Sequence, residues 1–253
     1  MNTTKTGAIA ETINKSLDKE LIIHGKAAFD IGPVVRYTTG IPSLDIVTGG
    51  IPRGRIIHIS GGEDSGKTTL ALQIAQFQDG PVLFMDAENK LTPYLVKDGR
   101  NLFTMYPDTL ESALSICKDA AKAFRVIVVD TITALPTRAD LEAGVANCTQ
   151  NRTAAEVLSR ALPILAGRMK ENGCTLILVN QLRNTGAMFG RPDKPTGGRA
   201  LGYYSALWLN LNRVEVTKDY QKVVISVRKN KYGRPFGKAV CILCYGEGIA
   251  EYV

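Results

Sequence analysis

Apolar residues in the middle of the chain gather into short runs that are separated by longer stretches of helical periodicity. The runs are rich in apolar residues and are bounded by turn residues, a pattern typical of buried strands. They are RIIHIS (55–60), PVLFMD (81–86), NLFTMY (101–106), RVIVVD (125–130) and TLILVN (175–180). Each run is followed by polar or glycine-rich residues, so we expect five strands, of which TLILVN should be buried.

The stretches between these runs repeat their apolar residues with the spacing of a helix. Pro163 lies inside the last stretch and is expected to kink or divide it, because proline removes a backbone hydrogen bond. The predicted helices cover 67–78, a segment near 91–98, 107–123 and 153–171. Alternating strands and helices predict an α/β fold with a mostly parallel central sheet that is covered by helices on both faces.

The rhythm changes after residue 200, where three strand-like segments follow one another without an intervening helix. They are ALWLNLNRVEV (206–216), KVVISVRKN (222–230) and AVCILCYG (239–246). We expect them to form antiparallel strands at the C-terminal edge of the sheet.

The N-terminus has a different pattern, in which Ile9, Ile13 and Leu17 recur at the spacing of one helix face. The segment ELIIHG (20–25) is typical of a short strand. Together these elements are too small to form a core of their own, so residues 1–33 are predicted to be an arm that docks elsewhere. Docking on a neighbouring subunit and packing on its own domain are both open at this point.

Composition adds two constraints. The net charge of +7 is uneven, since residues 1–180 carry 19 basic and 19 acidic side chains whereas residues 181–253 carry 12 and 5. This asymmetry suggests a surface that binds a polyanion, with a merely solvated basic surface as the alternative. No run approaches the ~18 apolar residues of a membrane helix, and the N-terminus has no signal core, so a cytoplasmic protein without a membrane partner is expected.

The five cysteines are widely scattered. Cys241 and Cys244 form a C-x-x-C pair, but on a strand these two positions point to opposite faces. We therefore expect all five cysteines to be reduced structural thiols rather than metal ligands or a disulfide.

The first predicted strand runs into GGEDSGKT (61–68), which fits the phosphate-binding pattern G-x-x-x-x-G-K-[ST]. Glycines allow backbone N–H groups to wrap around phosphate oxygens, and the helix that follows favours negative charge at its start. In this pattern Lys67 reaches the β- and γ-phosphates, and the Thr68 hydroxyl binds Mg²⁺. The sequence thus predicts a site for ATP and Mg²⁺.

Two further strand ends supply acidic residues to the same edge of the sheet. Asp130 ends the run RVIVVD and is expected to support the metal ion. Glu88, just after the run PVLFMD, is a candidate to activate water, whereas Asp86 is expected to cap the loop. The carboxyl edge of a parallel sheet is where ligands bind, so these groups should gather there.

The chain resembles the bacterial RecA recombinases over nearly its whole length and in the same order. The matching segments are SLDIVTGGIPRGRIIHISG (43–61), GGEDSGKTTL (61–70), FMDAEN (84–89), VIVVDTITAL (126–135), LILVNQLR (176–183), MFGRPDKPTGGRAL (188–201), VRKNKYGRPF (227–236) and YGEGI (245–249). The resemblance implies a RecA-like ATPase core over residues 34–253 and supports a docking role for the arm.

In that family ATP lies between the subunits of a helical filament on DNA. By resemblance, Gln181 senses the γ-phosphate, Lys229 and Lys231 reach the nucleotide of the neighbouring subunit, and Tyr203 plugs into that subunit. The arm would contribute Ile9 and Ile13 to the same interface. The family's adenine-stacking tyrosine falls on Leu95, beside Tyr94. The expected nucleotide-binding set is Gly61, Gly62, Glu63, Asp64, Ser65, Gly66, Lys67, Thr68, Thr69 and Tyr94.

The irregular segment 182–200 resembles the second DNA-binding loop of the family. Its glycines allow close approach to phosphates, its arginines add charge, and its apolar pair is suited to wedge between stacked bases. The candidate residues are Arg183, Met188, Phe189, Arg191, Thr196, Gly197, Gly198 and Arg199. Binding of the γ-phosphate to Gln181 would order this loop and link the ATP state to DNA affinity.

The first DNA-binding loop, near 140–153, matches less closely. Two family arginines fall on Glu156 and Pro163, and Arg152 and Arg160 are the candidates that replace them; Ser159 is a further candidate for DNA binding. The family's C-terminal domain has no counterpart here. A compact recombinase of a phage or mobile element is expected to look like this.

Three functions follow from these observations. The first is an ATP-dependent recombinase that forms filaments on single-stranded DNA and exchanges strands with homologous duplex DNA. The second is an accessory protein of the same fold that modulates recombination without exchanging strands. The third, a P-loop enzyme that does not act on DNA, such as a small-molecule kinase, conflicts with the matches at 188–201 and 227–236.

Overall fold

A computed structural model describes residues 3–16, 34–91, 101–143, 150–182, 198–245 and 247–251. The chain divides into two compact units, Met1–Val35 and Arg36–Val253. The first unit contains helix α1 (Thr3–Ser16), on which Ile13 is 38% exposed. Leu17 and the predicted strand over 20–25 lie outside the described residues.

Nine strands of the described residues form the large sheet of the second unit. In spatial order they are β11 (Gly248–Glu251), β10 (Lys238–Cys244), β9 (Tyr220–Asn230), β8 (Leu207–Val216), β3 (Ile56–Gly61), β7 (Thr175–Gln181), β6 (Val126–Asp130), β4 (Val82–Asp86) and β5 (Leu102–Met105). The strands from β8 to β5 are all parallel. The five predicted strands form β3, β4, β5, β6 and β7, which confirms the mostly parallel sheet.

The C-terminal edge is antiparallel, as predicted, but only from β9 outward. β8 itself runs parallel to β3, because the chain crosses back through α8 (Gly198–Tyr204) before β8 begins. The last strand, β11, was not predicted from the sequence. A separate pair, β1 (Arg36–Tyr37) and β2 (Ile51–Pro52), forms a small antiparallel sheet.

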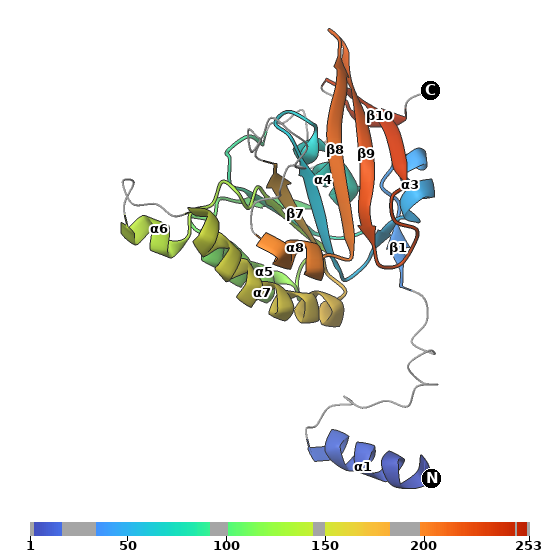
Figure 1. Cartoon of the computed structure of the whole chain (residues 1–253), viewed down its shortest axis with the longest axis vertical. Coiled ribbons are helices and arrows are strands. Elements are labelled where there is room, and N and C mark those ends of the chain that lie inside the picture. The colour runs from blue at the N-terminus through green and yellow to red at the C-terminus, as the bar shows by residue number, and fades with distance from the viewer. Residues whose placement is uncertain are drawn as a thin grey trace, which may run out of the picture. The chain divides into compact units, whose positions relative to one another are not determined.

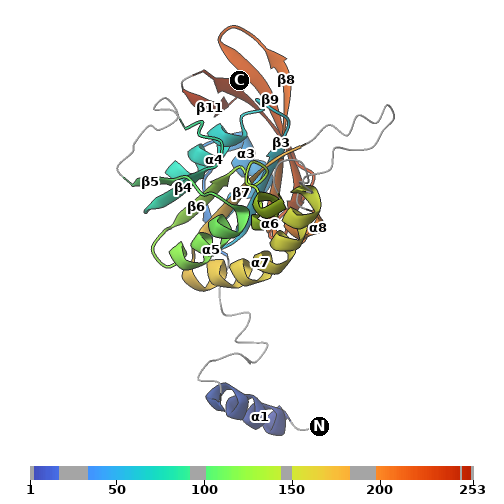
Figure 2. The same ribbon diagram turned by 90° about the vertical axis from the view of Figure 1, so that its left-hand side faces the viewer.

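Helices cover both faces of the parallel sheet, as Figures 1 and 2 show, and strands β3, β7, β6 and β4 at its centre are almost entirely buried. Successive strand residues point to opposite faces, so Ile57 and Ile59 belong to one core cluster and Ile56 to the other. The first cluster lies under α3 (Pro42–Thr48) and α4 (Lys67–Gln76), and the second lies under α5 (Leu110–Ala120) and α7 (Gln150–Asn172). This double burial explains why the strands read as continuous apolar runs.

The predicted helices over 67–78, 107–123 and 153–171 correspond to α4, α5 and α7, with boundaries shifted by a few residues. The helix predicted near 91–98 falls almost entirely outside the described residues. The short helices α3, α6 (Arg138–Ala143) and α8 were not predicted.

Pro163 was predicted to kink or divide the last helix, and division is wrong, because α7 continues through it. Pro163 has no N–H to donate to the Ser159 carbonyl, and both residues are exposed. Leu162 and Leu165 on the opposite side of the helix are buried in the core. Packing on both sides of the proline thus holds one helix together.

Two compositional expectations can be compared with the described residues. Among their helices, none combines the length and apolar character needed to cross a membrane. The four described cysteines are free thiols, of which Cys117, Cys174 and Cys241 are buried and Cys244 is partly exposed. Burial raises the pKa of Cys241 to about 11, so this thiol stays protonated at neutral pH.

Candidate nucleotide-binding site

The phosphate loop connects the end of β3 to the start of α4, as the sequence pattern predicts. At Gly61 a Cβ atom would lie 2.5 Å from Ser65 Oγ and 2.7 Å from the Leu211 carbonyl oxygen, so a larger residue does not fit. Gly66 has a φ of 87°, in the left-handed region that favours glycine, and it caps the N-terminus of α4. Ser65 Oγ donates to the Gly62 carbonyl over 2.9 Å and tightens the loop.

Lys67 is the first residue of α4 and points back over the loop. Its Nζ donates to the Gly62 carbonyl over 2.6 Å. Partial burial lowers the pKa of Lys67, while the nearby carboxylates of Asp130, Glu88 and Asp64 act in the opposite direction. The ammonium is thus held above the loop where an incoming phosphate would bind.

Asp130 ends β6 inside the same site and is 7% exposed. Burial raises the pKa of Asp130 to about 6, whereas a hydrogen bond from the Thr68 hydroxyl and the charge of Lys67 favour the ionised form. Thr68 and Asp130 therefore bring two hard oxygen donors together. Such donors suit Mg²⁺, so the residues present fit the predicted metal ion.

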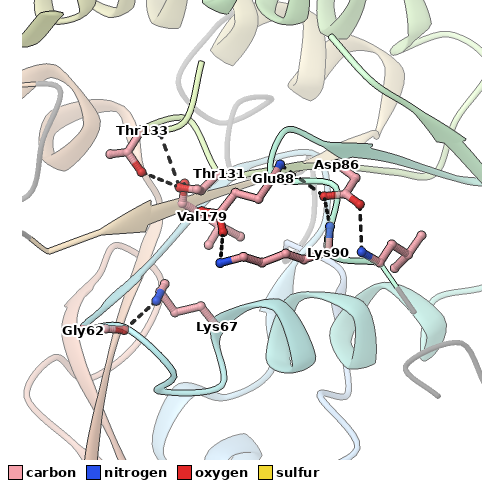
Figure 3. A network of polar contacts seen from close by, with 9 residues as sticks. Gly62, Lys67, Asp86, Glu88, Lys90, Thr131, Thr133 and Val179 are labelled. Carbon is pink, nitrogen blue, oxygen red and sulfur yellow. Dashed lines mark hydrogen bonds and ion pairs between the residues drawn. The ribbon is translucent and has the colours of Figure 1, made fainter. Parts of the chain in front are cut away.

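The segment after β4 carries the other predicted acids. Asp86 accepts hydrogen bonds from three backbone N–H groups, those of Glu88 (3.3 Å), Lys90 (3.1 Å) and Leu91 (2.8 Å), so it caps the loop as expected. Glu88 points into the site, where its Oε2 lies 2.6 Å from Nζ of Lys90 (Figure 3).

Gln181 ends β7 and is paired in register with Gly61 of the neighbouring strand. The backbone N–H of Leu182 donates to the Gly61 carbonyl over 3.0 Å, which fixes the strand end beside the phosphate loop. Thr131 Oγ1 donates to the Val179 carbonyl over 2.8 Å and ties the end of β6 to the same strand. Gln181, to which the family resemblance assigns γ-phosphate sensing, therefore lines the cavity from a fixed strand end.

These residues line one cavity of about 360 Å³. The structure brings together there the following residues predicted from the sequence: Glu63, Asp64, Ser65, Gly66, Lys67, Thr68, Thr69, Glu88, Asp130 and Gln181. Gly61 and Gly62 shape the loop without lining the cavity, and Tyr94 lies outside the described residues.

The cavity has a second wall that sequence reasoning missed. Besides Lys90, its residues come from β8, β9 and β10 and the turn after them, namely Arg213, Val216, Gln221, Leu243 and Tyr245. Tyr245 opens the segment YGEGI, so the resemblance offered a signal for it. The others are brought near the phosphate loop by strand pairing between distant parts of the sequence.

The family described as the RecA N-terminal domain matches residues 5–250. This chain belongs to the RecA family.

A solved structure, a crystal structure of the RadB recombinase, has a similar fold, with a TM-score of 0.66. It is 24% identical in sequence, and the match covers 86% of this chain and 100% of that chain. At this identity the likeness concerns the fold. Membership of the RecA family itself supports a role in recombination and a core of the ATP-binding type.

Three residues that the family resemblance assigns to the subunit interface lie away from this cavity. Leu207 at the start of β8 pairs with Ile57 at the start of β3 and with Asn230 at the end of β9. The end of β9 therefore lies at the same end of the sheet as the start of β3, opposite the phosphate loop. There Lys229 Nζ donates to the carbonyls of Gly202 (2.5 Å) and Tyr203 (2.8 Å).

Lys231 lies beside Lys229 at this edge. Its Nζ is 5.9 Å from the ring centre of Tyr203, which is 71% exposed. Burial and the neighbouring charge of Lys231 lower the pKa of Lys229. The structure thus groups Lys229, Lys231 and Tyr203 but does not bring them to the protomer's own cavity.

Most of the RecA-like DNA-binding residues lie outside the described residues: Arg183, Met188, Phe189, Arg191, Thr196 and Gly197. Gly198 and Arg199, assigned to the loop over 182–200, instead belong to α8. A Cβ on Gly198 would lie 3.1 Å from Ala155 Cβ, so close packing of α8 on α7 ends the loop earlier than predicted.

The first predicted DNA loop, 140–153, also overlaps helices, since α6 reaches Ala143 and α7 begins at Gln150. Arg152 falls in α7, although its side chain lies outside the described residues. Ser159 Oγ donates to the Ala155 carbonyl over 2.7 Å, and Arg160 lines a groove between α5 and α7. Ser159 and Arg160 are both exposed on α7, together with Glu156.

Proposed function

We propose that this chain is a DNA-dependent ATPase that assembles into helical filaments on single-stranded DNA and promotes homologous pairing and strand exchange. One observation carries the proposal. The residues suited to phosphate binding and water activation gather at the carboxyl ends of the parallel strands. Lys229, Lys231 and Tyr203 lie at the opposite end of the sheet, near the start of β3. A second copy of the chain that brings its Lys229, Lys231 and Tyr203 to the cavity would complete the site.

The hydrolysis reaction uses the residues of the cavity as follows. Glu88 accepts the proton of a water molecule whose oxygen bonds to the γ-phosphorus. The bond from this phosphorus to the β–γ bridging oxygen then breaks, and its electron pair leaves with ADP. Lys67 balances charge on the phosphates, and Gln181 contacts the γ-phosphate. When bound by Thr68 and Asp130, Mg²⁺ would supply further positive charge.

The lysines of the neighbouring protomer would act in trans. Lys229 and Lys231 carry positive charge on a strand end, and the carbonyls of Gly202 and Tyr203 hold Lys229 in place. Positive charge delivered across a subunit seam stabilises the charge that develops on the transferred phosphoryl group. Hydrolysis would then depend on assembly.

The arm of residues 1–33 would join the subunits. Strand β5 is the last strand of the described sheet on its side, and an open edge can accept a strand from another chain. Phe103 on β5 and Tyr106 just after it are 54% and 59% exposed. We propose that this edge receives the neighbour's arm, including Ile9 and Ile13.

DNA binding would be coupled to ATP through Gln181. This residue contacts the cavity, and the segment that resembles the second DNA-binding loop begins directly after it. The basic excess of residues 181–253 suits binding to the phosphate backbone. Base pairing, rather than the protein, would supply the sequence specificity, and added salt should weaken binding steeply.

One observation favours the accessory function as a second candidate. Glu156 stands exposed beside Ser159 and Arg160 on α7, where the resemblance leads us to expect arginine. An acidic side chain on a DNA-facing helix repels phosphates. A protein that binds single strands without exchanging them would fit this surface.

Formation of joint molecules tests the proposal. A labelled single strand is incubated with homologous duplex DNA, with and without ATP and Mg²⁺, using the wild type and Lys67→Ala. Joint molecules that require Lys67 are expected. Binding of single strands without product would support the accessory function, and the absence of DNA-stimulated ATP hydrolysis would reject both.

A further inference from the structure

The nucleotide cavity contains a second lysine to which neither the phosphate-loop pattern nor the family resemblance gave a role. Lys90 lines the cavity together with Lys67, Thr68 and Asp130. Its Nζ lies 2.6 Å from Glu88 Oε2. Figure 3 shows its side chain extended toward the Glu88 carboxylate, in the same region as Lys67.

The backbone that carries Lys90 is fixed. Asp86 accepts hydrogen bonds from the N–H groups of Lys90 and Leu91, and the Leu91 side chain packs against the core. Asn89 has a φ of 54°, so the chain turns sharply just before the lysine. The Cα atom from which the Lys90 side chain extends is therefore held beside the phosphate loop.

The ammonium group, in contrast, is free to change partner. The side chain of Lys90 is 65% exposed, and exposed ion pairs contribute little to stability. Breaking its contact with Glu88 therefore costs little, and a triphosphate offers more negative charge than one carboxylate. Both oxygens of Asp86 already accept backbone N–H groups, so Asp86 competes only weakly for the ammonium.

The electrostatics of the site agree with this geometry. The Glu88 carboxylate raises the pKa of Lys90, first by a hydrogen bond and then by its charge, and Glu63 and Asp64 of the phosphate loop act in the same direction. Lys90 in turn helps to lower the pKa of Lys67. The ammonium group of Lys90 is thus close enough to influence the pKa of Lys67, and both lysines are influenced by Glu88 and Asp64.

We propose that Lys90 makes the site selective for a γ-phosphate. Without nucleotide its ammonium neutralises Glu88; when ATP binds, the ammonium moves to a γ-phosphate oxygen and leaves the Glu88 carboxylate free to accept the proton of the attacking water. The inference rests on the proposed function, since it assigns a further role within the same cavity. ADP has no γ-phosphate, so with ADP the ammonium stays on Glu88.

Equilibrium binding separates this role from an ordinary surface ion pair. The affinities of the full-length chain for ADP and for the non-hydrolysable analogue AMP-PNP are measured by calorimetry with Mg²⁺. Because a hydrogen bond between charged groups is lost, Lys90→Ala should weaken AMP-PNP binding about tenfold and leave ADP binding within about twofold. Lys90→Arg should retain most of the selectivity, and Lys90→Gln should lose it.

A double-mutant cycle tests the exchange of partners. Glu88→Gln removes the competing carboxylate, so it should tighten AMP-PNP binding about threefold, and adding Lys90→Ala should abolish that gain. Arg168→Ala is the matched control, because it breaks an exposed ion pair with Glu171 of 3.0 Å away from the cavity. It should change neither affinity.

The outcomes are distinguishable. An unchanged ratio of AMP-PNP to ADP affinity in Lys90→Ala, with wild-type binding intact, overturns the role of Lys90 and leaves the proposed function standing. A wild-type chain that binds neither nucleotide rejects the proposed function and this inference with it.

Discussion

The two ends of the central β-strands are built on different principles. At the carboxyl end of β3, glycines shape a phosphate loop, and Glu88, Asp130 and Gln181 from the ends of β4, β6 and β7 line the same cavity. At the opposite end, charged and polar side chains make the contacts, both with other side chains and with backbone carbonyls. Tyr232 accepts a hydrogen bond from Arg55 Nε over 2.6 Å, and the Arg55 guanidinium lies 5.3 Å from its ring centre.

The opposite end is also anchored to the rest of the core through the turn that follows β9. Arg36 donates to the Tyr232 carbonyl and to the Thr48 carbonyl, and Asn230 Nδ2 donates to the same Thr48 carbonyl over 2.8 Å. Lys231 stands between these two anchored residues. The carboxyl end, here the first end, is thus shaped to receive a ligand, whereas the opposite, second end is shaped to hold charges in place. This difference supports the proposal that each site between two protomers takes its phosphate loop from one protomer and its lysines from the other.

Removing the positive charges of Lys229 and Lys231 at the second end should have the largest effect on ATP turnover. Replacing Lys229 and Lys231 with Ala should lower DNA-dependent ATP turnover about a thousandfold, because charge supplied in trans stabilises the transition state. ATP affinity of isolated subunits should stay nearly intact. Turnover in the presence of single-stranded DNA and nucleotide binding in its absence are the two measurements.

Mixed filaments sharpen this test. The lysine variant keeps a working phosphate loop, and Lys67→Ala keeps both lysines of the second end. When equal amounts are mixed, about a quarter of the seams should pair a working loop with working lysines and recover turnover. A mixture that stays inactive would place both halves of the site in one protomer.

The next largest effect should come from the first end. Glu88→Gln should lower hydrolysis about a hundredfold, since general-base catalysis contributes at least that much. ATP binding should persist, and filaments should last longer because the nucleotide that stabilises them is not turned over. Unchanged turnover would remove Glu88 from its role, and the lifetime can be followed by the release of labelled DNA.

The contrast between the ends also decides what could be predicted from the sequence. The parallel strands and the phosphate loop were predictable, because double burial produces apolar runs and the loop needs glycine and lysine at fixed spacing. The direction of β8 could not be predicted from the sequence, because it depends on the crossover through α8. Arg213 and Gln221 reach the cavity only through the register of β8 and β9, which leaves no local pattern.

Other features escaped prediction because a local rule was outweighed or no rule existed. Pro163 was expected to kink or divide α7, but the helix is not divided, because buried leucines on both sides of the proline hold it together. Glu88 was expected from its place after a strand, whereas its pairing with Lys90 depends on the turn that Asp86 stabilises. A short helix such as α8 has too few residues to show a period.

A smaller effect should follow from loosening the second end without removing its charges. Tyr232→Ala deletes the contact with Arg55 and should lower filament turnover about tenfold, because a misplaced charged group loses much of its effect. Tyr232→Phe keeps the ring and should fall in between. Mixing Tyr232→Ala with Lys67→Ala should restore activity at some seams, whereas general damage to the fold would not be recovered in this way.

The last prediction concerns stability rather than turnover, in the core between the two ends, where His58 on β3 is fully buried and stacks on Trp208 at 4.9 Å. Neither ring nitrogen has a hydrogen-bond partner among the described residues, and burial lowers the pKa of His58 to about 3.

The unfolded chain takes up a proton at His58 near pH 6.5 and the folded chain does not, so acidification favours unfolding. Between pH 7 and pH 5 this group should remove about 2 kcal/mol of stability. Asp130 acts in the opposite sense, because its raised pKa lets the folded state bind a proton first. The contribution of His58 therefore has to be isolated by comparison with His58→Leu, in which Asp130 is unchanged. Urea unfolding at both pH values should show that the free energy of unfolding of the wild type falls by about 2 kcal/mol more than that of the variant. Equal losses would mean that the histidine is hydrated or paired. The strand that joins the two ends would then be less tightly packed than the geometry indicates.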